Sequence, residues 1–403
     1  MKEKMIQAFK EANGGMFSSV EKADVGDAYQ KMKEAGVDLM GWADPFMPDK
    51  SLPKHVEEAL IEAIKDASSA HYTAPIGNQI LKEALAKRLK AFNGLDVDPY
   101  RNILITPGSD SGLYYAMLPF IVVGDEVIIF TPSYPNNFSN VKIMSGKIVP
   151  VLLKEEDKYQ INEEALRSSI TSKTKMIVIT HPNNPTTTVF DRQSLMILRD
   201  VVVEFDLVLV CDQAFEDFCF ENEFITPATL PDMFERTITV FSISKGMGLS
   251  GLRVGYIVCA DEVMDKLHAN AVSVIGATNT ASQHATIAAL SDMSFMRDFE
   301  IAYNIRRIEA YRILNSIPNV SMFMPESGFL AWVNVSKLGN SSEIVNYLVK
   351  EAKVAVNDGI NYGPGGEGHL RIVLGVYKDN HKVIDALERI KVALIKWQEK
   401  YNT

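Results

Sequence analysis

Between residues 102 and 260 the chain alternates short apolar runs with stretches of helical periodicity, and this rhythm restricts the fold more than any other feature. Six runs have the length and composition of buried strands: 102–105, 126–130, 176–180, 207–211, 237–242 and 253–259. Apolar strands that alternate with helices are typical of a parallel sheet covered on both faces. The sequence therefore predicts an α/β fold with a doubly wound, mainly parallel (mixed) sheet.

The segments on either side of this region differ in character. Residues 54–92 have a helical pattern, and the second helix there carries an apolar stripe of Leu81, Leu85, Leu89 and Phe92. Beyond residue 295, shorter strand-like pieces lie between a helix over 297–314 and a final helix. The first of these helices is marked by Ile301, Ile305 and Ile308, and the final one by Val383, Leu387, Ile390, Leu394 and Trp397. We predict a large domain over 46–295 and a smaller α+β domain built from both termini, 1–45 plus 296–403.

Composition narrows the function classes. The 403 residues suffice for two domains, and the net charge of −10, with Lys and Arg spread along the chain, argues against a nucleic-acid or acidic-membrane partner. The three cysteines and seven histidines show no metal-ligand spacing, so no metal is expected. The N-terminus lacks the apolar core of a signal peptide, and no apolar run could span a bilayer. We expect a cytoplasmic protein that acts on a small metabolite.

A glycine-rich stretch, 242–256, raises the possibility of a dinucleotide site. Gly246, Gly248 and Gly251 have the spacing of a dinucleotide fingerprint, which requires a strand before the glycines and a helix that begins on them. Residues 252–258 read as another strand, so no helix N-terminus is available for a pyrophosphate. This argues against a nicotinamide or flavin loop and directs attention to Lys245 and Arg253.

Polar residues follow each predicted strand, at the edge where doubly wound sheets bind their ligands. The turn 106–112 consists of small residues and opens a helix, an arrangement that suits a phosphate. Tyr134 follows the second strand and can stack on a flat ring, and Asn184, fixed by Pro185, follows the third. Asp212 ends the fourth strand, where a buried carboxylate needs a cationic partner.

The fifth strand is followed by further polar residues that complete the candidate ligand-binding set. It delivers Ser242, Ser244 and Lys245, and Arg253 comes eight residues later. A phosphorylated pyridine aldehyde uses all of these: a lysine for the Schiff base, an acid for the ring nitrogen, and a turn, a serine and an arginine for the phosphate. Each feature is weak alone, but their order along the chain is specific.

From about residue 35 to about residue 395 the chain resembles the class I/II aminotransferases, the pyridoxal-phosphate enzymes of fold type I. The resemblance depends on Ser242-Ile243-Ser244-Lys245 with Arg253, on Asn184-Pro185-Thr186, and on Asp212-Gln213-Ala214. It implies that the cofactor is pyridoxal 5'-phosphate and that Lys245 forms the Schiff base and carries protons. It also implies that Asp212 contacts the ring nitrogen, Asn184 the ring hydroxyl oxygen and Tyr134 the ring face.

The resemblance assigns the remaining site residues as well. The phosphate would be bound by Gly108, Ser109, Asp110, Ser242 and Arg253, while Phe215 and Ser244 complete the cofactor site. Arg371 would clamp the substrate α-carboxylate, beside Asn184, Gly41 and Trp42, as the small domain closes. Tyr72 resembles a tyrosine that reaches the phosphate of a partner subunit, which implies a homodimer with shared active sites.

Two positions depart from the family pattern. Many relatives have a tyrosine where this chain has Phe215, so one donor to the ring oxygen is missing, and we expect a raised Schiff-base pKa. A glycine usually follows the Asn-Pro-Thr sequence, and this chain has Thr187 there, from which we draw no functional conclusion.

The resemblance implies transamination between an L-amino acid and a 2-oxo acid by a ping-pong mechanism. The same fold also serves lyases and decarboxylases, and Trp42-Ala43-Asp44 is faintly similar to cysteine-sulfur lyases, so such a lyase is the alternative. A regulatory, cofactor-sensing module is a third reading, which would need a DNA-binding domain. No arginine occurs between Val254 and Met296, where dicarboxylate-selective relatives place one, and this weakens an aspartate or glutamate assignment without fixing the substrate.

Overall fold

The computed structural model describes residues 4–10 and 31–401, and it is organised around a seven-stranded sheet. The strand order is β2-β8-β7-β6-β5-β3-β4, and only β8 runs antiparallel to its neighbours β2 and β7. The strands are β2 (Ile103–Thr106), β3 (Glu126–Thr131), β4 (Lys147–Leu152), β5 (Thr174–Thr180), β6 (Val208–Asp212), β7 (Thr237–Ser242) and β8 (Gly255–Val258). The predicted mixed, mainly parallel α/β sheet is confirmed.

The sequence missed one strand of this sheet. β4 lies at an edge, and five of its six residues are at least partly exposed. It also contains Pro150, which cannot donate a ladder hydrogen bond and is tolerated at a sheet edge. Without a continuous apolar run, β4 carried no strand signal.

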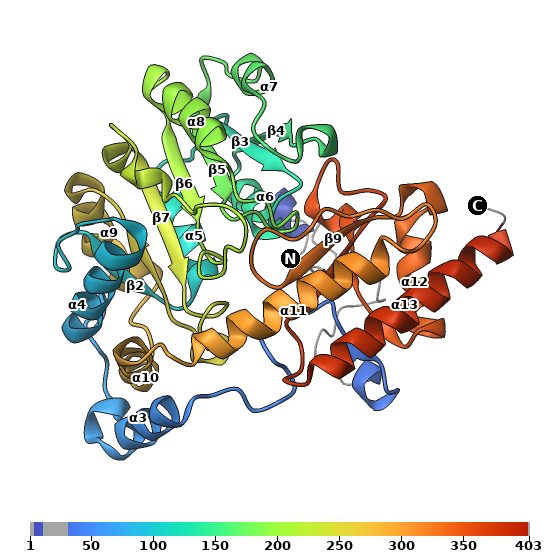
Figure 1. Cartoon of the computed structure of the whole chain (residues 1–403). Helices are drawn as coiled ribbons and strands as arrows, with labels where there is room; N and C mark the ends of the chain where they lie inside the picture. Colours follow the sequence, from blue (N-terminus) through green and yellow to red (C-terminus); the bar gives the residue numbers. More distant parts are fainter. Residues whose placement is uncertain (1–3, 11–30, 402–403) are drawn as a thin grey trace.

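Helices cover both faces of the sheet (Figure 1). They are α3 (Lys54–Lys65), α4 (Gln79–Arg88), α5 (Ser109–Met117), α6 (Pro135–Ile143), α7 (Glu163–Ser168), α8 (Arg192–Glu204), α9 (Asp261–Val274) and α10 (Thr280–Ser291). A further short helix, α1, spans Gln7–Lys10. The last of the glycines of 246–251 lies within a 3-10 turn, Ser250–Leu252, which is followed by strand β8. The prediction that no dinucleotide-type helix begins there is therefore confirmed.

The stripe predicted for α4 is correct except at its end. Leu81, Leu85 and Leu89 are fully buried, but Phe92 is 47% exposed. Residues Leu89–Asn93 form a π-helix, whose wider turn moves Phe92 away from the line of the leucines. The Phe92 ring instead stacks on Phe224 and lies under the guanidinium of Arg88.

The C-terminal part forms smaller sheets packed against long helices. One sheet has the order β11-β12-β9 (Asn357–Asp358, His369–Val373 and Leu330–Asn334), and in another β1 (Asp38–Leu39) pairs in parallel with β10 (Val354–Ala355). The helices are α11 (Met296–Leu314), α12 (Ser341–Glu351) and α13 (Asn380–Tyr401). The proposed domain limits at 45 and 295 stay a prediction, and residues 1–3, 11–30 and 402–403 lie outside the described part.

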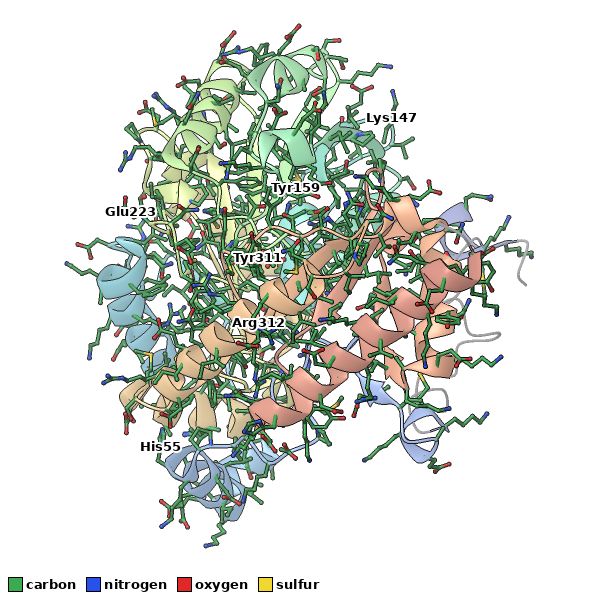
Figure 2. The ribbon with its side chains drawn as sticks, turned by 45° about the vertical axis from the view of Figure 1, so that its right-hand side comes forward. His55, Lys147, Tyr159, Glu223, Tyr311 and Arg312 are labelled. Atoms are coloured by element: carbon green, nitrogen blue, oxygen red, sulfur yellow. The ribbon has the colours of Figure 1, made fainter. Side chains whose placement is uncertain are left out.

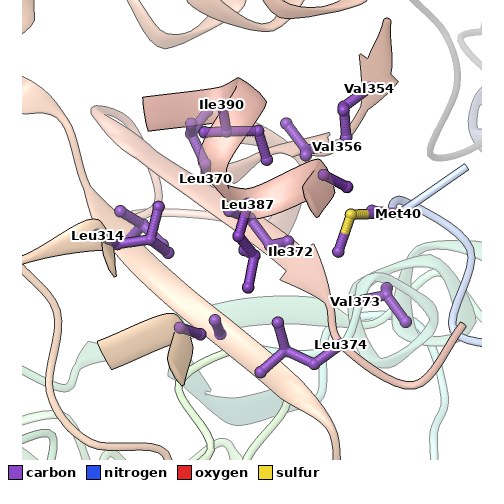
Figure 3. Close-up of a cluster of buried hydrophobic side chains, with 14 of the residues drawn as sticks. Met40, Leu314, Val354, Val356, Leu370, Ile372, Val373, Leu374, Leu387 and Ile390 are labelled. Carbon is purple, nitrogen blue, oxygen red and sulfur yellow. The ribbon is translucent and has the colours of Figure 1, made fainter. Parts of the chain in front are cut away.

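Side chains of α13 and of the small sheets form one apolar cluster. Figure 3 shows Leu387 and Ile390 beside Leu370, Ile372 and Met40. The face predicted for the final helix is confirmed, since Val383, Leu387, Ile390, Leu394 and Trp397 are all buried. This cluster holds the N-terminal strand β1 against the C-terminal third of the chain.

The helix predicted over 297–314 exists, but its isoleucines do not face the core. Ile301 is 51% exposed, and Ile305 and Ile308 are also exposed. The buried face carries Phe299, Tyr303 and Ala310, because the aromatic rings pack against Phe46. Figure 2 shows Tyr311 and Arg312 on this helix, and both are exposed.

Replacing Leu387 by alanine is expected to lower the free energy of unfolding by about 2–5 kcal/mol, since a buried leucine leaves a cavity. Ile301→Ala is the matched control, and it should change that free energy by no more than about 0.5 kcal/mol because the side chain is exposed. Urea unfolding followed by circular dichroism measures both. An equal loss for the two variants would contradict this assignment of faces.

Candidate functional site

A cavity of about 460 Å³ lies where the parallel strands end. Asp212 and Ser242 are the last residues of the neighbouring strands β6 and β7, and both line it. The structure gathers twelve predicted site residues around this cavity: Trp42, Ser109, Asp110, Tyr134, Asn184, Asp212, Phe215, Ser242, Ser244, Lys245, Arg253 and Arg371. Segments separated by more than 300 residues thus share one site.

Lys245 follows β7 and lies within the cavity wall. Its Nζ atom donates to the carbonyl oxygen of Ala43 at 2.5 Å, and it lies 6.0 Å from the ring centroid of Phe215. Burial lowers the pKa of Lys245 to about 8, and the nearby positive charge of Arg371 acts in the same direction. At pH 7 about a tenth of this amine is therefore unprotonated and nucleophilic, far more than for a lysine of ordinary pKa.

Asp212 is a buried carboxylate without an ion-pair partner among the described residues. Its oxygens accept hydrogen bonds from the backbone N–H of Ala214 at 3.1 Å and the hydroxyl of Thr180 at 3.5 Å. Burial raises its pKa to about 7. We expected a cation beside this acid; since the chain supplies none in contact, a protonated ring nitrogen of a ligand suits the position.

The start of α5 and Arg253 meet at a tightly packed corner. Gly108, at a φ of 85°, lies so close to Arg253 that a Cβ atom there would be 2.3 Å from the Nη2 atom. A Cβ at Gly255 would approach the Ser109 nitrogen to 2.6 Å. The helix N-terminus and a guanidinium are thereby brought together, which is a suitable arrangement for a phosphate.

Asp110 lies at this corner with its carboxylate already engaged. It accepts hydrogen bonds from the hydroxyl of Tyr134 at 2.9 Å and the amide of Asn136 at 2.8 Å, and it lies 4.0 Å from Arg253. A carboxylate repels a phosphate, so only the backbone N–H of Asp110 fits the predicted phosphate role.

Arg371 is the most deeply buried cation of the cavity, at 1% exposure. Its guanidinium donates to Asn357 Oδ1 at 2.7 Å, to the Gly41 carbonyl at 2.9 Å and to Asn184 Oδ1 at 3.1 Å. All three acceptors are neutral, and no carboxylate of the described chain pairs with it. A buried cation held only by neutral groups favours an anionic ligand such as a carboxylate.

Three predicted residues lie outside the cavity lining. Gly41 and Gly108 contact residues of the lining: the Gly41 carbonyl accepts a hydrogen bond from Arg371, and Gly108 packs against Arg253. Tyr72 is 98% exposed and lines a separate surface depression with His71, Thr73 and residues 277–280. Within a single chain, therefore, Tyr72 does not reach the site. Thr187 adopts a φ of 65°, the left-handed conformation for which a glycine is better suited.

Sequence reasoning missed several contributors. Asp44 and Ser250 line the cavity and are hydrogen-bonded to each other through Ser250 Oγ. Arg88 pairs with Glu216 and Asp217 in a buried cluster, and the Asp217 carboxylate packs directly on Gly246, next to Lys245. Asp44 could have been predicted, because it follows the predicted site residue Trp42 by two positions. Arg88 could not, because it lies 128 residues from Glu216 along the chain.

Other kinds of site find no support in the described residues. No group of three or more His, Cys, Asp or Glu side chains there is arranged to bind a metal ion. No described helix is long and apolar enough to cross a membrane.

Comparison with known proteins agrees with this geometry. A family model described as aminotransferase class I and II matches residues 38–390. The chain is 33% identical to an aspartate aminotransferase of Pyrococcus horikoshii, covering 86% of this chain and 88% of the relative. It is 31% identical to aromatic-amino-acid aminotransferase 2 of Thermococcus litoralis, over 85% and 89% of the two chains.

Solved structures show the same similarity. An aromatic aminotransferase from Pyrococcus horikoshii superposes with a TM-score of 0.85 at 29% identity, covering 93% of this chain and all of that one. The aspartate aminotransferase of Thermus thermophilus with maleate gives a TM-score of 0.83 at 28% identity, over 92% and 95%.

The raised pKa of Asp212 has a consequence for stability. The pKa of Asp212 in the folded protein, about 7, exceeds the ordinary value of 3.8 that applies in the unfolded chain. The stability that this carboxyl contributes below about pH 4 is therefore lost as the pH rises to about 7. The asparagine of Asp212→Asn cannot ionise. In the ligand-free protein, the unfolding free energy of this variant should therefore increase relative to that of the parent as the pH rises across this range. Urea unfolding at several pH values measures the difference, with exposed Asp298→Asn as control. A difference independent of pH would refute the assignment.

Proposed function

This chain belongs to the class I and II aminotransferases, and on that basis we propose that its cofactor is pyridoxal 5'-phosphate, bound through Lys245. The observation that carries the proposal is that a low-pKa lysine and a buried acid line one cavity and follow or end adjacent strands, β7 and β6. The substrates are an L-amino acid and a 2-oxo acid. Bound there, the cofactor supplies the electron sink that makes an amino acid's α-hydrogen acidic.

The residues of the cavity fit such a cofactor on both sides. The corner formed by Gly108, Ser109 and Arg253 would hold the phosphate, with Ser242 beside it. Asp212 would hold the protonated ring nitrogen, which supplies the cation that this buried carboxylate requires. Asn184 presents an amide NH₂ group that can donate to the ring oxygen.

Tyr134, Phe215 and Ser244 line the same cavity and complete the proposed cofactor site. Phe215 offers no hydroxyl, so the amide of Asn184 would be the donor to the ring oxygen from this wall. The expected rise in the Schiff-base pKa stays a prediction.

The chain's own groups account for substrate positioning and proton transfer. Arg371 would grip the α-carboxylate, which provides the anion that its neutral surroundings lack. The Nζ atom of Lys245, with a pKa near 8, can accept a proton and return it near neutral pH. Gly41 and Trp42 would cover the bound substrate from the N-terminal segment.

We propose further that the chain acts as a homodimer with shared active sites. Tyr72 is 98% exposed in the single chain, and by the family resemblance its hydroxyl would reach the phosphate of the partner subunit. A hybrid test separates shared from independent sites. Tyr72→Ala and Lys245→Ala subunits should each have low activity alone. After mixing and random reassembly, roughly a quarter of all active sites should be intact, because each hybrid dimer has one site with both residues present. No recovery with confirmed hybrid formation would contradict shared sites.

The experiment that tests the function follows the absorbance of the purified, cofactor-loaded protein. Addition of an amino acid should change the cofactor band, and a 2-oxo acid should restore it without release of ammonia or carbon dioxide. Release of ammonia or carbon dioxide would favour a lyase or decarboxylase instead. Lys245→Ala is the control, and it should lower the rate of exchange by about 10²-fold or more.

Arg371→Lys is expected to raise KM for the amino acid by about 10- to 100-fold, because a lysine cannot grip a carboxylate through two parallel hydrogen bonds. The rate at saturation should change less, since the group acts in binding. Steady-state kinetics measures both values. An unchanged KM would show that the carboxylate binds elsewhere.

A further inference from the structure

Six charged side chains line the cavity, and the proposed function uses four of them. The cations are Lys245, Arg253 and Arg371, and the acids are Asp44, Asp110 and Asp212. The three cations and Asp212 are engaged by the cofactor and the α-carboxylate in the proposal above. The carboxylate of Asp110 is held by Tyr134 and Asn136 at the phosphate end. Asp44 is therefore the one charge of the lining with no assigned role.

Asp44 lies on the wall formed by the N-terminal segment. Its Oδ1 atom accepts a hydrogen bond from Ser250 Oγ, which fixes the carboxylate without neutralising it. Among the acids near Lys245, Asp44 acts most strongly to raise the lysine's pKa, so its negative charge is felt inside the cavity. No Lys, Arg or His of the described residues forms an ion pair with it.

An aromatic side chain accompanies this carboxylate. Trp42 is separated from Asp44 by one residue and lines the same cavity. The face of an indole ring and a carboxylate both attract a positive charge, and neither favours an anion.

A second cavity borders the same wall. This cavity of about 310 Å³ shares Asp44, Ser250 and Gly251 with the first and has Asp49 among its other lining residues. No lysine, arginine or histidine is among those lining residues. A substrate side chain that extends away from Arg371 toward Ser250 thus enters a region with acidic groups.

We propose that Trp42 and Asp44 form a subsite for the positively charged end of the substrate side chain, so that the enzyme prefers amino acids with an ammonium or guanidinium group. This inference rests on the proposed function, because it takes the α-carboxylate to be at Arg371. An acidic side chain at the same place meets the carboxylate of Asp44 and is disfavoured by like-charge repulsion.

Three acids of equal chain length that lack an α-amino group test the subsite without turnover. Pentanoate, 5-aminopentanoate and glutarate each carry one carboxylate for Arg371 and differ only at the far end. The Schiff base of the cofactor-loaded protein is first reduced with borohydride, so that the primary amine of 5-aminopentanoate cannot react with the cofactor. Titration calorimetry with this protein should give 5-aminopentanoate a dissociation constant about fivefold or more below that of pentanoate, with glutarate the weakest.

The variant Asp44→Asn keeps the shape of the side chain and removes its charge. It should abolish the advantage of 5-aminopentanoate and leave pentanoate binding within about twofold, while thermal unfolding verifies the fold. Asp298→Asn makes the same change of net charge at an exposed position outside both cavities and should preserve the preference.

The subsite and the proposed function are contradicted by different results. Equal binding of the three acids, tightest binding of glutarate, or an unchanged preference in Asp44→Asn would overturn the subsite. If no neutral, acidic or basic amino acid alters the cofactor absorbance, the proposed function is wrong, and the acids still report on Asp44 because they need no reaction.

Discussion

The burial of one guanidinium organises the site. Arg371 is carried by β12 and hydrogen-bonded to β11, to the loop after β5 and to the N-terminal segment, through Asn357, Asn184 and Gly41. These hydrogen bonds connect the sheet β11-β12-β9, a loop of the seven-stranded sheet and the segment around Gly41 through one cation. Removing a charge from water is costly, and the neutral acceptors compensate only in part, so the arrangement is suited to an anionic ligand.

The same dry environment shifts the ionisation of the neighbouring groups in opposite directions. Burial lowers the pKa of Lys245 and raises that of Asp212, since in each case it disfavours the charged form. Both values come close to neutrality, where an amine can carry protons and an acid can respond to a cationic ring. Asp44 adds a fixed negative charge on the wall formed by the N-terminal segment, which the proposed subsite uses for selectivity.

A second buried polar cluster supports the site from behind. Arg88 binds Glu216 and Asp217 a few residues after Asp212, and Asp217 packs against Gly246. Only a glycine fits there, because a Cβ atom would lie 1.8 Å from the carboxylate oxygen. The cluster therefore ties the end of β6 to the lysine turn after β7, and it gives Gly246 a structural role that its dinucleotide-like spacing obscured.

The sequence by itself determined six of the seven strands of the central sheet, the final helix and most of the residues of the cavity. Those signals are local: β-rich apolar runs, a stripe at helical spacing, and polar residues placed directly after strands. The sequence did not determine the edge strand β4, the outward turn of Phe92 or the exposed side of α11, because each depends on which surface a neighbouring element covers. Only the tertiary structure decided that Asp44 faces the lysine and that Arg88 supports it, since hydrogen bonds and charges act through space between segments whose separation along the chain carries no signal.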